Sequence, residues 1–318
     1  MLQMTRQREA GEAAQAAFEE ARIALARRIV AHMSGEGKEP AALPGLSLYR
    51  KCAPSECNSV NYQPELIVFA QGEKRIEVGG TTHLCNGSTF LLSAIDLPVV
   101  SQVTRASVEE PILAVILKLE MPAVREILSQ EEFLALEISS GARGMAVGKT
   151  PLELLQACSR LLDLLDSPAD MPFLGGLMQR EILYRVLRSP LGKHLRAIAT
   201  LGEQSNRTAR AIAWLKSNYD KPLRVEELAS VAQMGLSTFH HHFRSLTAMS
   251  PLQYQKRLRL HTARVRMVTE GIDAASAAFH VGYESASQFS REYSRLFGVP
   301  PMRDARERRS VEEAAARE

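Results

Sequence analysis

Two stretches in the last third of the chain decide its fold. The first is VEELASVAQMGLSTFHHHFRSLTAMSP, residues 225–251, and the second is AASAAFHVGYESASQFSREYSRLFGVPP, residues 274–301. Each contains a short apolar helix, a tight turn and a longer helix with one polar face, which is the pattern of a helix-turn-helix. Because the second helix of such a unit lies in the DNA major groove, two units predict contact with two successive groove segments.

The first unit has a predicted recognition helix at residues 236–246. Leu236, Phe239 and Phe243 recur at helical spacing, so we expect them to face the core. The histidines at 240–242 also suggest a metal site, but adjacent residues on a helix point in different directions, which favours DNA contact. The opposite polar stripe, expected to contact base edges or phosphates, consists of Ser237, His240, His241 and Arg244.

The second unit begins its recognition helix after Ser285, a residue type that caps helix N-termini well. Gln side chains suit adenine edges and Arg side chains suit guanine, whereas an Arg near the helix end suits a phosphate, as we expect for the last position. A plain solvated helix face is the alternative interpretation. The residues expected in the core are Phe289, Tyr293 and Leu296. The outward residues predicted to contact DNA are Ser287, Gln288, Arg291 and Arg295.

The stretch between the units begins at Pro251 and ends at Gly271. These limits predict a helix of roughly 19 residues, about 28 Å long. Such a spacer suits two recognition helices that lie about one DNA turn apart, on the order of 34 Å. A pair of units with a rigid spacer is therefore stronger evidence for DNA binding than either unit alone.

Charge is distributed unevenly along the chain. Residues 205–309 hold 17 Lys and Arg against 9 Asp and Glu, an excess of eight, although the whole chain carries only +3. The remainder is therefore mildly acidic. A basic C-terminal third indicates a polyanion-binding domain beside one that avoids DNA. A solvated basic surface is the alternative.

The segments SPLQYQKRLRLHTAR, 250–264, and FHVGYESASQFSREYSRLFGVPP, 279–301, resemble the signature region of the AraC/XylS family of transcription regulators. The match covers about residues 200–304. Upstream, LPGLSLYR, FAQGEKRIEVGG, LLSAIDLPVVSQVT and FLGGLMQREILYRVL resemble a subfamily with its own N-terminal ligand domain, of AraC_N type. The resemblance implies a cupin-like β-barrel that senses a small molecule, followed by the DNA-binding domain.

Some positions depart from the family pattern. Gly235 stands where the family usually has a Ser cap, and Ala248 stands where Gly is common at the helix end. His240 and His241 replace longer polar residues, so the resemblance does not define base preference there.

The fold class expected for the whole chain is α+β. From residue 46 to about 119, short Val-, Ile- and Leu-rich runs are split by turn residues, as in a cupin-like β-barrel, with hairpin turns at 79–80 and 86–87. Helical patterns follow from residue 121, including 122–136 and 150–168. The expected domains are an N-terminal helix and linker (1–45), a sensory domain (46–197), a DNA-binding domain (198–304) and a frayed charged tail (305–318).

Polar and aromatic residues among the predicted strands are candidates for a ligand pocket. Period-two alternation allows at most one of the adjacent Lys74 and Arg75 to point inward, and it places Arg50 on the face of Leu46 and Leu48. The basic members suit an anionic effector such as a cyclic dinucleotide. Outward-facing strand residues are the alternative. The candidates are Tyr49, Arg50, Tyr62, Gln71, Lys74 and Arg75.

Two other functions are alternatives to ligand sensing. Cys52 and Cys57 suggest a thiol sensor of aldehydes or oxidants, with inert thiols as the alternative. A cupin-type enzyme would need a cluster of metal ligands, but the barrel segment has only His83. We therefore expect no catalytic site, no metal and no cofactor.

The expected partners are double-stranded DNA, a small effector and, for an activator, RNA polymerase, with a homodimer as the assembly. The N-terminus has acidic residues interleaved and lacks the apolar core of a signal peptide. No stretch approaches the roughly 18 apolar residues of a membrane span. We therefore expect a cytoplasmic protein without membrane contact.

Overall fold

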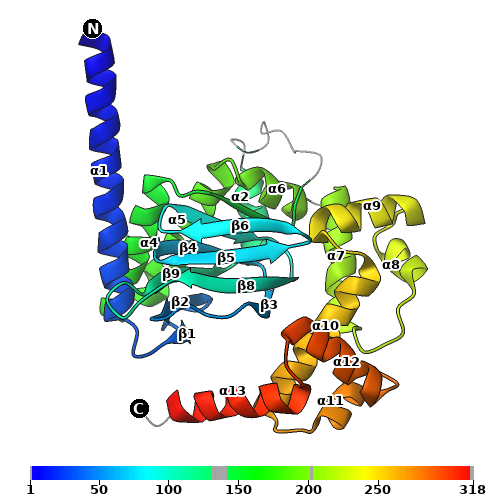
Figure 1. Cartoon of the computed structure of the whole chain (residues 1–318). Helices are drawn as coiled ribbons and strands as arrows, with labels where there is room; N and C mark the ends of the chain where they lie inside the picture. Colours follow the sequence, from blue (N-terminus) through cyan, green and yellow to red (C-terminus); the bar gives the residue numbers. More distant parts are fainter. Residues whose placement is uncertain (1, 131–132, 134–141, 201–202, 316–318) are drawn as a thin grey trace.

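The computed structural model describes residues 2–130, 133, 142–200 and 203–315. Within them, ten strands form two antiparallel sheets that face each other, one in the order β1-β2-β9-β4-β7-β10 and one in the order β3-β8-β5-β6. The predicted α+β class and cupin-like N-terminal region are confirmed, with two facing sheets rather than a fully closed barrel (Figure 1). The strands are β1 (Gly37–Pro40), β2 (Leu46–Lys51), β3 (Asn58–Tyr62), β4 (Glu65–Gln71), β5 (Glu73–Val78), β6 (Thr81–Asn86), β7 (Thr89–Ser93), β8 (Leu97–Arg105), β9 (Ile112–Lys118) and β10 (Met145–Lys149).

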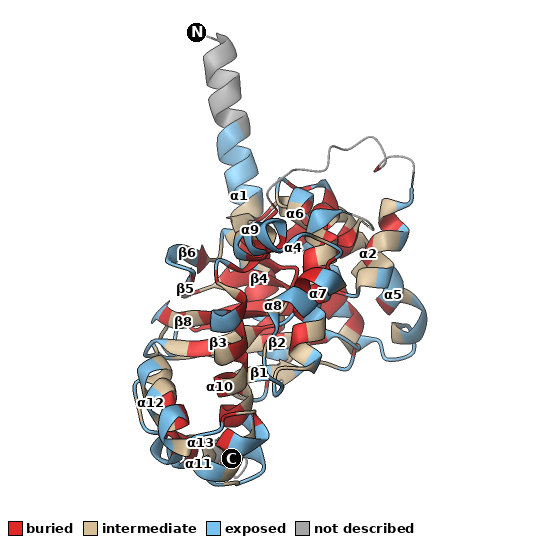
Figure 2. Cartoon of the chain, turned by 90° about the vertical axis from the view of Figure 1, so that its right-hand side faces the viewer, coloured by how far each residue is buried: buried red, intermediate tan, exposed pale blue. Residues whose placement is uncertain are grey.

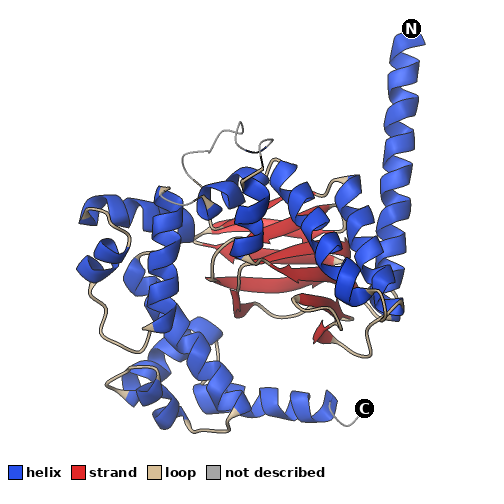
Figure 3. Cartoon of the chain, turned by 180° about the vertical axis from the view of Figure 1, so that it is seen from behind, coloured by secondary structure: helices blue, strands red, loops and turns tan. Residues whose placement is uncertain are grey.

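Helices cover the face of the larger sheet that is turned away from the smaller one (Figure 3). The long helix α1 extends beyond this layer at the N-terminus (Figure 1). The helices of this half are α1 (Leu2–Ala31), α2 (Met121–Leu128), α4 (Leu152–Asp163) with the 3₁₀ turn η1 (Leu164–Asp166), α5 (Met171–Arg188) and α6 (Gly192–Ala199). The C-terminal half is helical throughout, with α7 (Gln204–Ser217), α8 (Val225–Val231), α9 (Leu236–Thr247), α10 (Pro251–Thr269), α11 (Ala274–His280), α12 (Ala286–Phe297) and α13 (Pro301–Ala315).

Buried side chains form two separate clusters. The larger one joins both sheets, the helices that cover them and the first helix-turn-helix, so that Phe239 and Phe243 share a core with the sensory domain. The smaller one belongs to the second helix-turn-helix and contains Phe289 and Tyr293. The first unit is therefore built onto the sensory domain, whereas the second has a core of its own.

Several predicted boundaries agree with the structure. The spacer helix α10 spans 19 residues from Pro251, where Ser250 and Gln253 form a reciprocal capping box. Turns lie at 79–80 and at 87–88, between the predicted strands. Helix α4 begins directly after Pro151, as predicted, and the 3₁₀ turn that follows it ends at Asp166.

Three expectations need correction. Residues 145–149, predicted within a helical region, form strand β10 because they pair with β7 at the sheet edge. The C-terminal tail, expected to be frayed, is helical to Ala315 because Asp304 and Arg308 anchor α13 to neighbouring elements. The helix predicted over 122–136 ends at Leu128, and its later part at 131–132 and 134–136 lies outside the described residues.

Candidate nucleic-acid interface and internal cavity

The two recognition helices, α9 and α12, each bury one aromatic face and leave the opposite face open to solvent. Phe239, Phe243, Phe289 and Tyr293 have no exposed surface. Ser285 accepts a hydrogen bond from the backbone N–H of Gln288, which confirms the predicted cap of α12. Figure 2 shows exposed residues along both helices.

All eight side chains predicted to contact DNA are exposed. Leu236, predicted to face the core with Phe239, is instead 43% exposed because it lies in the first turn of α9, beyond the reach of the core. Phe239 and Phe243, with the buried Leu246 and Thr247 nearer its end, therefore hold this helix in place. The exposed residues are Ser237, His240, His241 and Arg244 on α9, and Ser287, Gln288, Arg291 and Arg295 on α12.

Glu292, which the sequence analysis did not single out, organises the polar side of α12. It accepts hydrogen bonds from Lys256 Nζ at 2.8 Å, from Gln288 Nε2 at 3.1 Å and from the Tyr283 hydroxyl at 2.8 Å. Burial alone would raise the pKa of Glu292, but these donors outweigh it and lower the pKa. One amide hydrogen of Gln288 is therefore used in a hydrogen bond to Glu292 on the same helix. This bond fixes the orientation of the exposed Gln288 side chain.

A cavity of about 170 Å³ lies between the two sheets. It contains three of the predicted ligand residues, Tyr49, Tyr62 and Lys74. The Lys74 ammonium group lies 5.0 Å from the ring centre of Tyr49 and 5.7 Å from that of Tyr62, in cation–π geometry. The rest of the lining is Lys38, Val60, Asn61, Glu65, Ile67, Phe69, Ala114 and Ile116.

The polar groups of this cavity are incompletely paired. Tyr62 is 8% exposed, and neither its hydroxyl nor the Asn61 side-chain oxygen has a hydrogen-bond partner in the described part of the chain. Lys38 pairs with the buried Glu65 at 3.0 Å, whereas Lys74 forms no ion pair with any described residue. Burial raises the pKa of Tyr49 and of Tyr62, so both hydroxyls stay protonated donors.

The other three predicted ligand residues lie outside the cavity lining. Arg50 and Arg75 are on the opposite faces of their strands from Tyr49 and Lys74, as alternation requires. Arg75 donates to the Gln102 side-chain oxygen at 2.7 Å on the outer surface. Gln71 donates to the Pro111 carbonyl at 3.0 Å and so holds the loop before β9. The pleat therefore separates Tyr49 from Arg50 and Lys74 from Arg75, whereas Gln71 lies beyond a register shift that follows Phe69.

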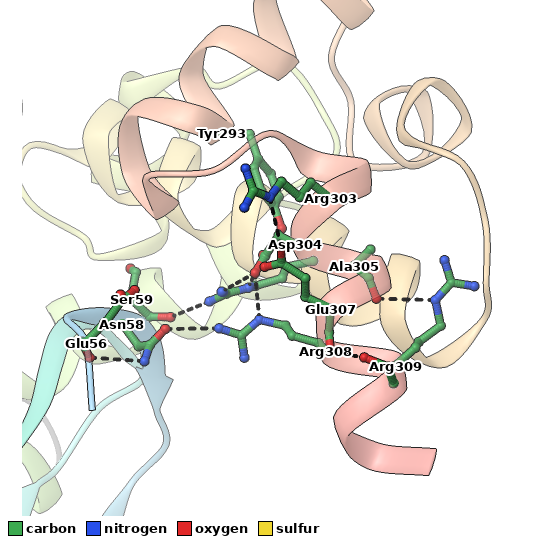
Figure 4. Close-up of polar contacts among 12 residues, drawn as sticks. Glu56, Asn58, Ser59, Tyr293, Arg303, Asp304, Ala305, Glu307, Arg308 and Arg309 are labelled. Atoms are coloured by element: carbon green, nitrogen blue, oxygen red, sulfur yellow. Dashed lines mark hydrogen bonds and ion pairs between the residues drawn. The ribbon is translucent and has the colours of Figure 1, made fainter. Parts of the chain in front are cut away.

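Strand β3 joins this cavity to the second helix-turn-helix. Val60, Asn61 and Tyr62 line the cavity, while the preceding residues of the same strand contact the DNA-binding half. Asn58 accepts a hydrogen bond from Arg308 at 3.0 Å (Figure 4). The Ser59 hydroxyl lies 2.7 Å from His261 Nε2 on α10. One five-residue strand therefore touches both the internal cavity and the second unit.

The first helix-turn-helix is attached to the sensory domain by different contacts. Lys216 pairs with Asp96 at 2.6 Å, and the Tyr254 hydroxyl donates to the Asp96 carbonyl at 2.6 Å. The Gly144 N–H donates to the Leu246 carbonyl at the end of α9.

In the described ranges, no group of three or more His, Cys, Asp or Glu side chains is arranged to hold a metal ion. None of the described helices is long and apolar enough to cross a membrane.

Comparison with known proteins places both halves in one family. Residues 42–194 match the model of the AraC-type transcriptional regulator N-terminus, and residues 228–307 match that of a helix-turn-helix domain. This chain belongs to the AraC/XylS family. The family predicted from the sequence, with its N-terminal ligand domain, is thereby confirmed.

Curated relatives match this family member over part of its length. The transcriptional activator RhaS of Yersinia pestis is 31% identical over 104 residues, which are 33% of this chain and 38% of RhaS. RhaS of Escherichia fergusonii is 29% identical over 150 residues, 46% of this chain and 52% of RhaS. The chain thus spans about half or less of the length of the relatives it matches.

Solved structures match the whole architecture. ToxT from Vibrio cholerae aligns with a TM-score of 0.54 at 13% identity, over 82% of this chain and 97% of ToxT. ToxT with a bound unsaturated fatty acid aligns with a TM-score of 0.55 at 12% identity, over 86% of this chain and 97% of ToxT. At such identities the likeness shows the shared two-domain fold and nothing further.

Proposed function

We propose that this protein is a transcription regulator that binds double-stranded DNA through both helix-turn-helix units and responds to a small effector in the cavity between its sheets. The observation that carries the proposal is the exposure of eight polar side chains on two recognition helices that bury Phe239 and Phe243, and Phe289 and Tyr293, on their other faces. A helix fixed by its core and open on a polar face can present side chains to base edges without reorganising.

Activation of transcription is part of this proposal. The RhaS relatives are named as transcriptional activators, which supports activation and contact with RNA polymerase here. Family membership also supports a regulator over a cupin-type enzyme. The homodimer expected from the sequence stays a prediction.

The cavity favours a small monoanion with an apolar body. Lys38 and Glu65 neutralise each other, so Lys74 leaves the cavity with one unbalanced positive charge. The unpaired Tyr62 hydroxyl can donate a hydrogen bond to the same anion, while Ile67 and Phe69 supply apolar contact. ToxT structures contain a fatty acid and a substituted butenoic acid, both carboxylic acids, which supports a carboxylate as the effector class.

The volume of the cavity argues against a cyclic dinucleotide. Pockets for drug-sized ligands hold about 300–1,000 Å³, whereas this one holds about 170 Å³. A short monocarboxylate fits that space better than two linked nucleotides do.

A thiol sensor is less well supported than a ligand sensor. Burial and a hydrogen bond involving Glu36 raise the pKa of Cys52, which lowers its thiolate fraction and its reactivity. Neither Cys52 nor Cys57 lines the cavity. Full inducibility after both are replaced by Ser would exclude thiol or aldehyde chemistry at these positions.

Fluorescence anisotropy with DNA duplexes tests the DNA-binding role. Arg291→Ala should cost roughly 1–3 kcal/mol on a preferred sequence and relax base preference. Arg295→Ala should weaken binding evenly across sequences and reduce the salt slope by about one. Identical specificity profiles for the two variants would contradict these roles, and absence of DNA binding by the wild type and by every variant tested would refute the proposal.

Isothermal titration with a series of monocarboxylates from butyrate to octanoate tests the effector site. Lys74→Met should abolish binding of whichever acid binds the wild type, because it removes the unbalanced cation. Arg75→Met is the matched control, since the adjacent side chain lies on the outer face, and it should bind as the wild type does. Equal binding by Lys74→Met and the wild type would contradict the proposal that the effector binds in this cavity.

A further inference from the structure

The turn between β5 and β6 lies directly against the end of the first recognition helix. A Cβ atom added to Gly79 would lie 2.1 Å from the Ala248 Cβ, whereas one added to Gly80 would meet nothing within 4 Å. Both glycines have positive φ angles, +54° and +82°. In Figure 1 the hairpin points at the junction of α9 and α10. At this point the sensory domain meets the end of the recognition helix through a turn that carries no side chain.

This turn borders a basic groove between the two helix-turn-helix units. The groove holds about 550 Å³ and is bounded by α9, α10, α12 and the turn. One residue predicted to contact DNA comes from each recognition helix, Arg244 and Arg295, so the groove opens on the side that faces DNA. Its four cations are Arg244, Lys256, Arg257 and Arg295, and its one carboxylate, Glu292, is paired with Lys256.

We propose that the DNA sugar-phosphate backbone and the β5–β6 turn compete for this groove, so that DNA binds only when the turn withdraws. The inference rests on the proposed DNA-binding function and extends it in two ways. It adds Lys256 and Arg257 of the spacer helix to the residues that contact phosphate. It also makes the turn at 79–80 an autoinhibitory contact between the sensory domain and the DNA-binding domain.

Charge and shape support the competition. Because both turn residues are glycines, the turn occupies space without neutralising the groove, which keeps its attraction for phosphate. Glu77, two residues before the turn, attracts Arg257 in the groove, and nearby the Gly144 N–H donates to the Leu246 carbonyl. Among the described residues no hydrogen bond or ion pair joins Gly79 or Gly80 to the groove, so an effector or DNA can displace the turn without breaking one.

The turn itself provides a matched pair of variants. Gly79→Ala and Gly80→Ala place the same methyl group at positive φ, but only the first collides with Ala248. Anisotropy with a random-sequence DNA duplex should show Gly79→Ala binding about fivefold or more tighter than Gly80→Ala, the lower end of typical coupling between sites. The salt slope should steepen by about 0.9 for each phosphate newly contacted. Equal affinities and slopes for the two variants would overturn the competition.

A second pair avoids any strain at the turn. Glu77→Gln weakens the attraction to Arg257, whereas Glu73→Gln alters the same strand at a residue bonded to Thr104. Glu77→Gln should bind the duplex more tightly than Glu73→Gln, and equal binding would count against the proposal even where Gly79→Ala does not fold.

Hydrogen exchange on the wild type gives an independent measure. Adding the duplex should speed amide exchange at residues 77–82, because the turn must leave the groove. Unchanged or slower exchange there, with DNA bound, would overturn the competition while leaving the DNA-binding function intact. Absence of DNA binding by every protein tested would refute both.

Discussion

Asp304 is a buried carboxylate that ties three helices together. It accepts hydrogen bonds from Arg264 at 2.7 and 2.9 Å, from Tyr293 at 2.6 Å and from Arg308 at 2.9 Å. Burial alone would raise the pKa of Asp304, but these donors, Arg264 foremost, lower it. Arg264 also donates to the Ser59 carbonyl, so the same cluster touches β3 (Figure 4).

Replacing Asp304 by Asn should lower the free energy of unfolding by about 3–5 kcal/mol, because Arg264 is left buried without a counter-charge. Urea unfolding measures the change. Since the folded pKa is lowered, the wild-type contribution is complete above the unfolded pKa of about 3.9 and is lost as pH falls through the folded value. Glu307→Gln breaks only an exposed pair with Arg303 and should change stability by less than about 1 kcal/mol.

His261 is a buried neutral histidine at the contact between β3 and α10. Burial, with the nearby charges of Arg264 and Arg257, lowers its pKa to about 3. The ring lies edge-on to Phe297, with ring centres 5.3 Å apart, and is bonded to Ser59. A folded pKa below the unfolded value of about 6.5 means that its contribution is present above pH 6.5 and is lost as pH falls toward 3.

His261→Asn should therefore flatten the pH dependence of stability. Between about pH 6 and pH 4, the free energy of unfolding of the wild type should fall more steeply than that of the variant, by up to about 1.4 kcal/mol per pH unit. Denaturant titrations at several pH values measure the two slopes. His240→Gln, on an exposed face, should keep the wild-type slope, and parallel slopes for His261→Asn and wild type would contradict the assignment.

At the scale of elements, the two recognition helices end differently. Both C-caps are left-handed, but α9 ends on Ala248 with φ of +57° and α12 ends on Gly298 with φ of +79°. A left-handed conformation costs a residue with a Cβ roughly 1–2 kcal/mol, which Gly avoids.

Ala248→Gly should therefore raise the free energy of unfolding by about 1 kcal/mol, and Gly298→Ala should lower it by a similar amount. A Cβ added at Gly298 would meet nothing within 4 Å, so backbone strain alone sets that change. Thermal or urea unfolding of both variants checks the pair, and shifts of the same sign would show that the caps do not control these helices.

At the scale of the whole molecule, the two helix-turn-helix units are attached to the sensory domain unequally. The first shares its core, whereas the second has a separate core and reaches the sensory domain through polar contacts at β3. Because β3 also lines the cavity, an effector bound there as proposed would contact the strand that holds the second unit. We infer that effector occupancy alters the position of the second unit more than that of the first.

The double substitution Asn58→Ala and Ser59→Ala should loosen the second unit selectively. Loss of two hydrogen bonds of about 1 kcal/mol each should speed amide exchange in α11 and α12 by roughly thirtyfold, while α9 keeps its protection. Lys216→Met removes the ion pair with Asp96 that attaches the first unit. It should speed amide exchange in α9, while α11 and α12 keep their protection. Equal changes in both units would contradict unequal attachment.

Local patterns were sufficient for much of the DNA-binding half. The spacing of Phe239, Phe243, Phe289 and Tyr293 predicted the buried faces, and the residues between them were correctly expected on the outside. The predicted burial of Leu236 was wrong. Helical spacing shows which residues share a face of the helix, but it does not show whether another element packs against that face. The extent of the spacer helix followed from Pro251 and Gly271, which act within a few residues of the chain.

The sequence alone determined the two recognition helices, the strand alternation and the family, because these depend on contacts close along the chain. Tertiary structure decided that Tyr49 and Lys74 line the cavity and that Arg50 and Arg75 do not. When both faces of a strand are buried, its sequence does not show which face is turned toward the other sheet. Tertiary structure also decided that the tail is anchored through Asp304, that β10 is a strand and that Gly79 meets Ala248. Each of these depends on partners far along the chain, whose pairing only the folded packing brings about.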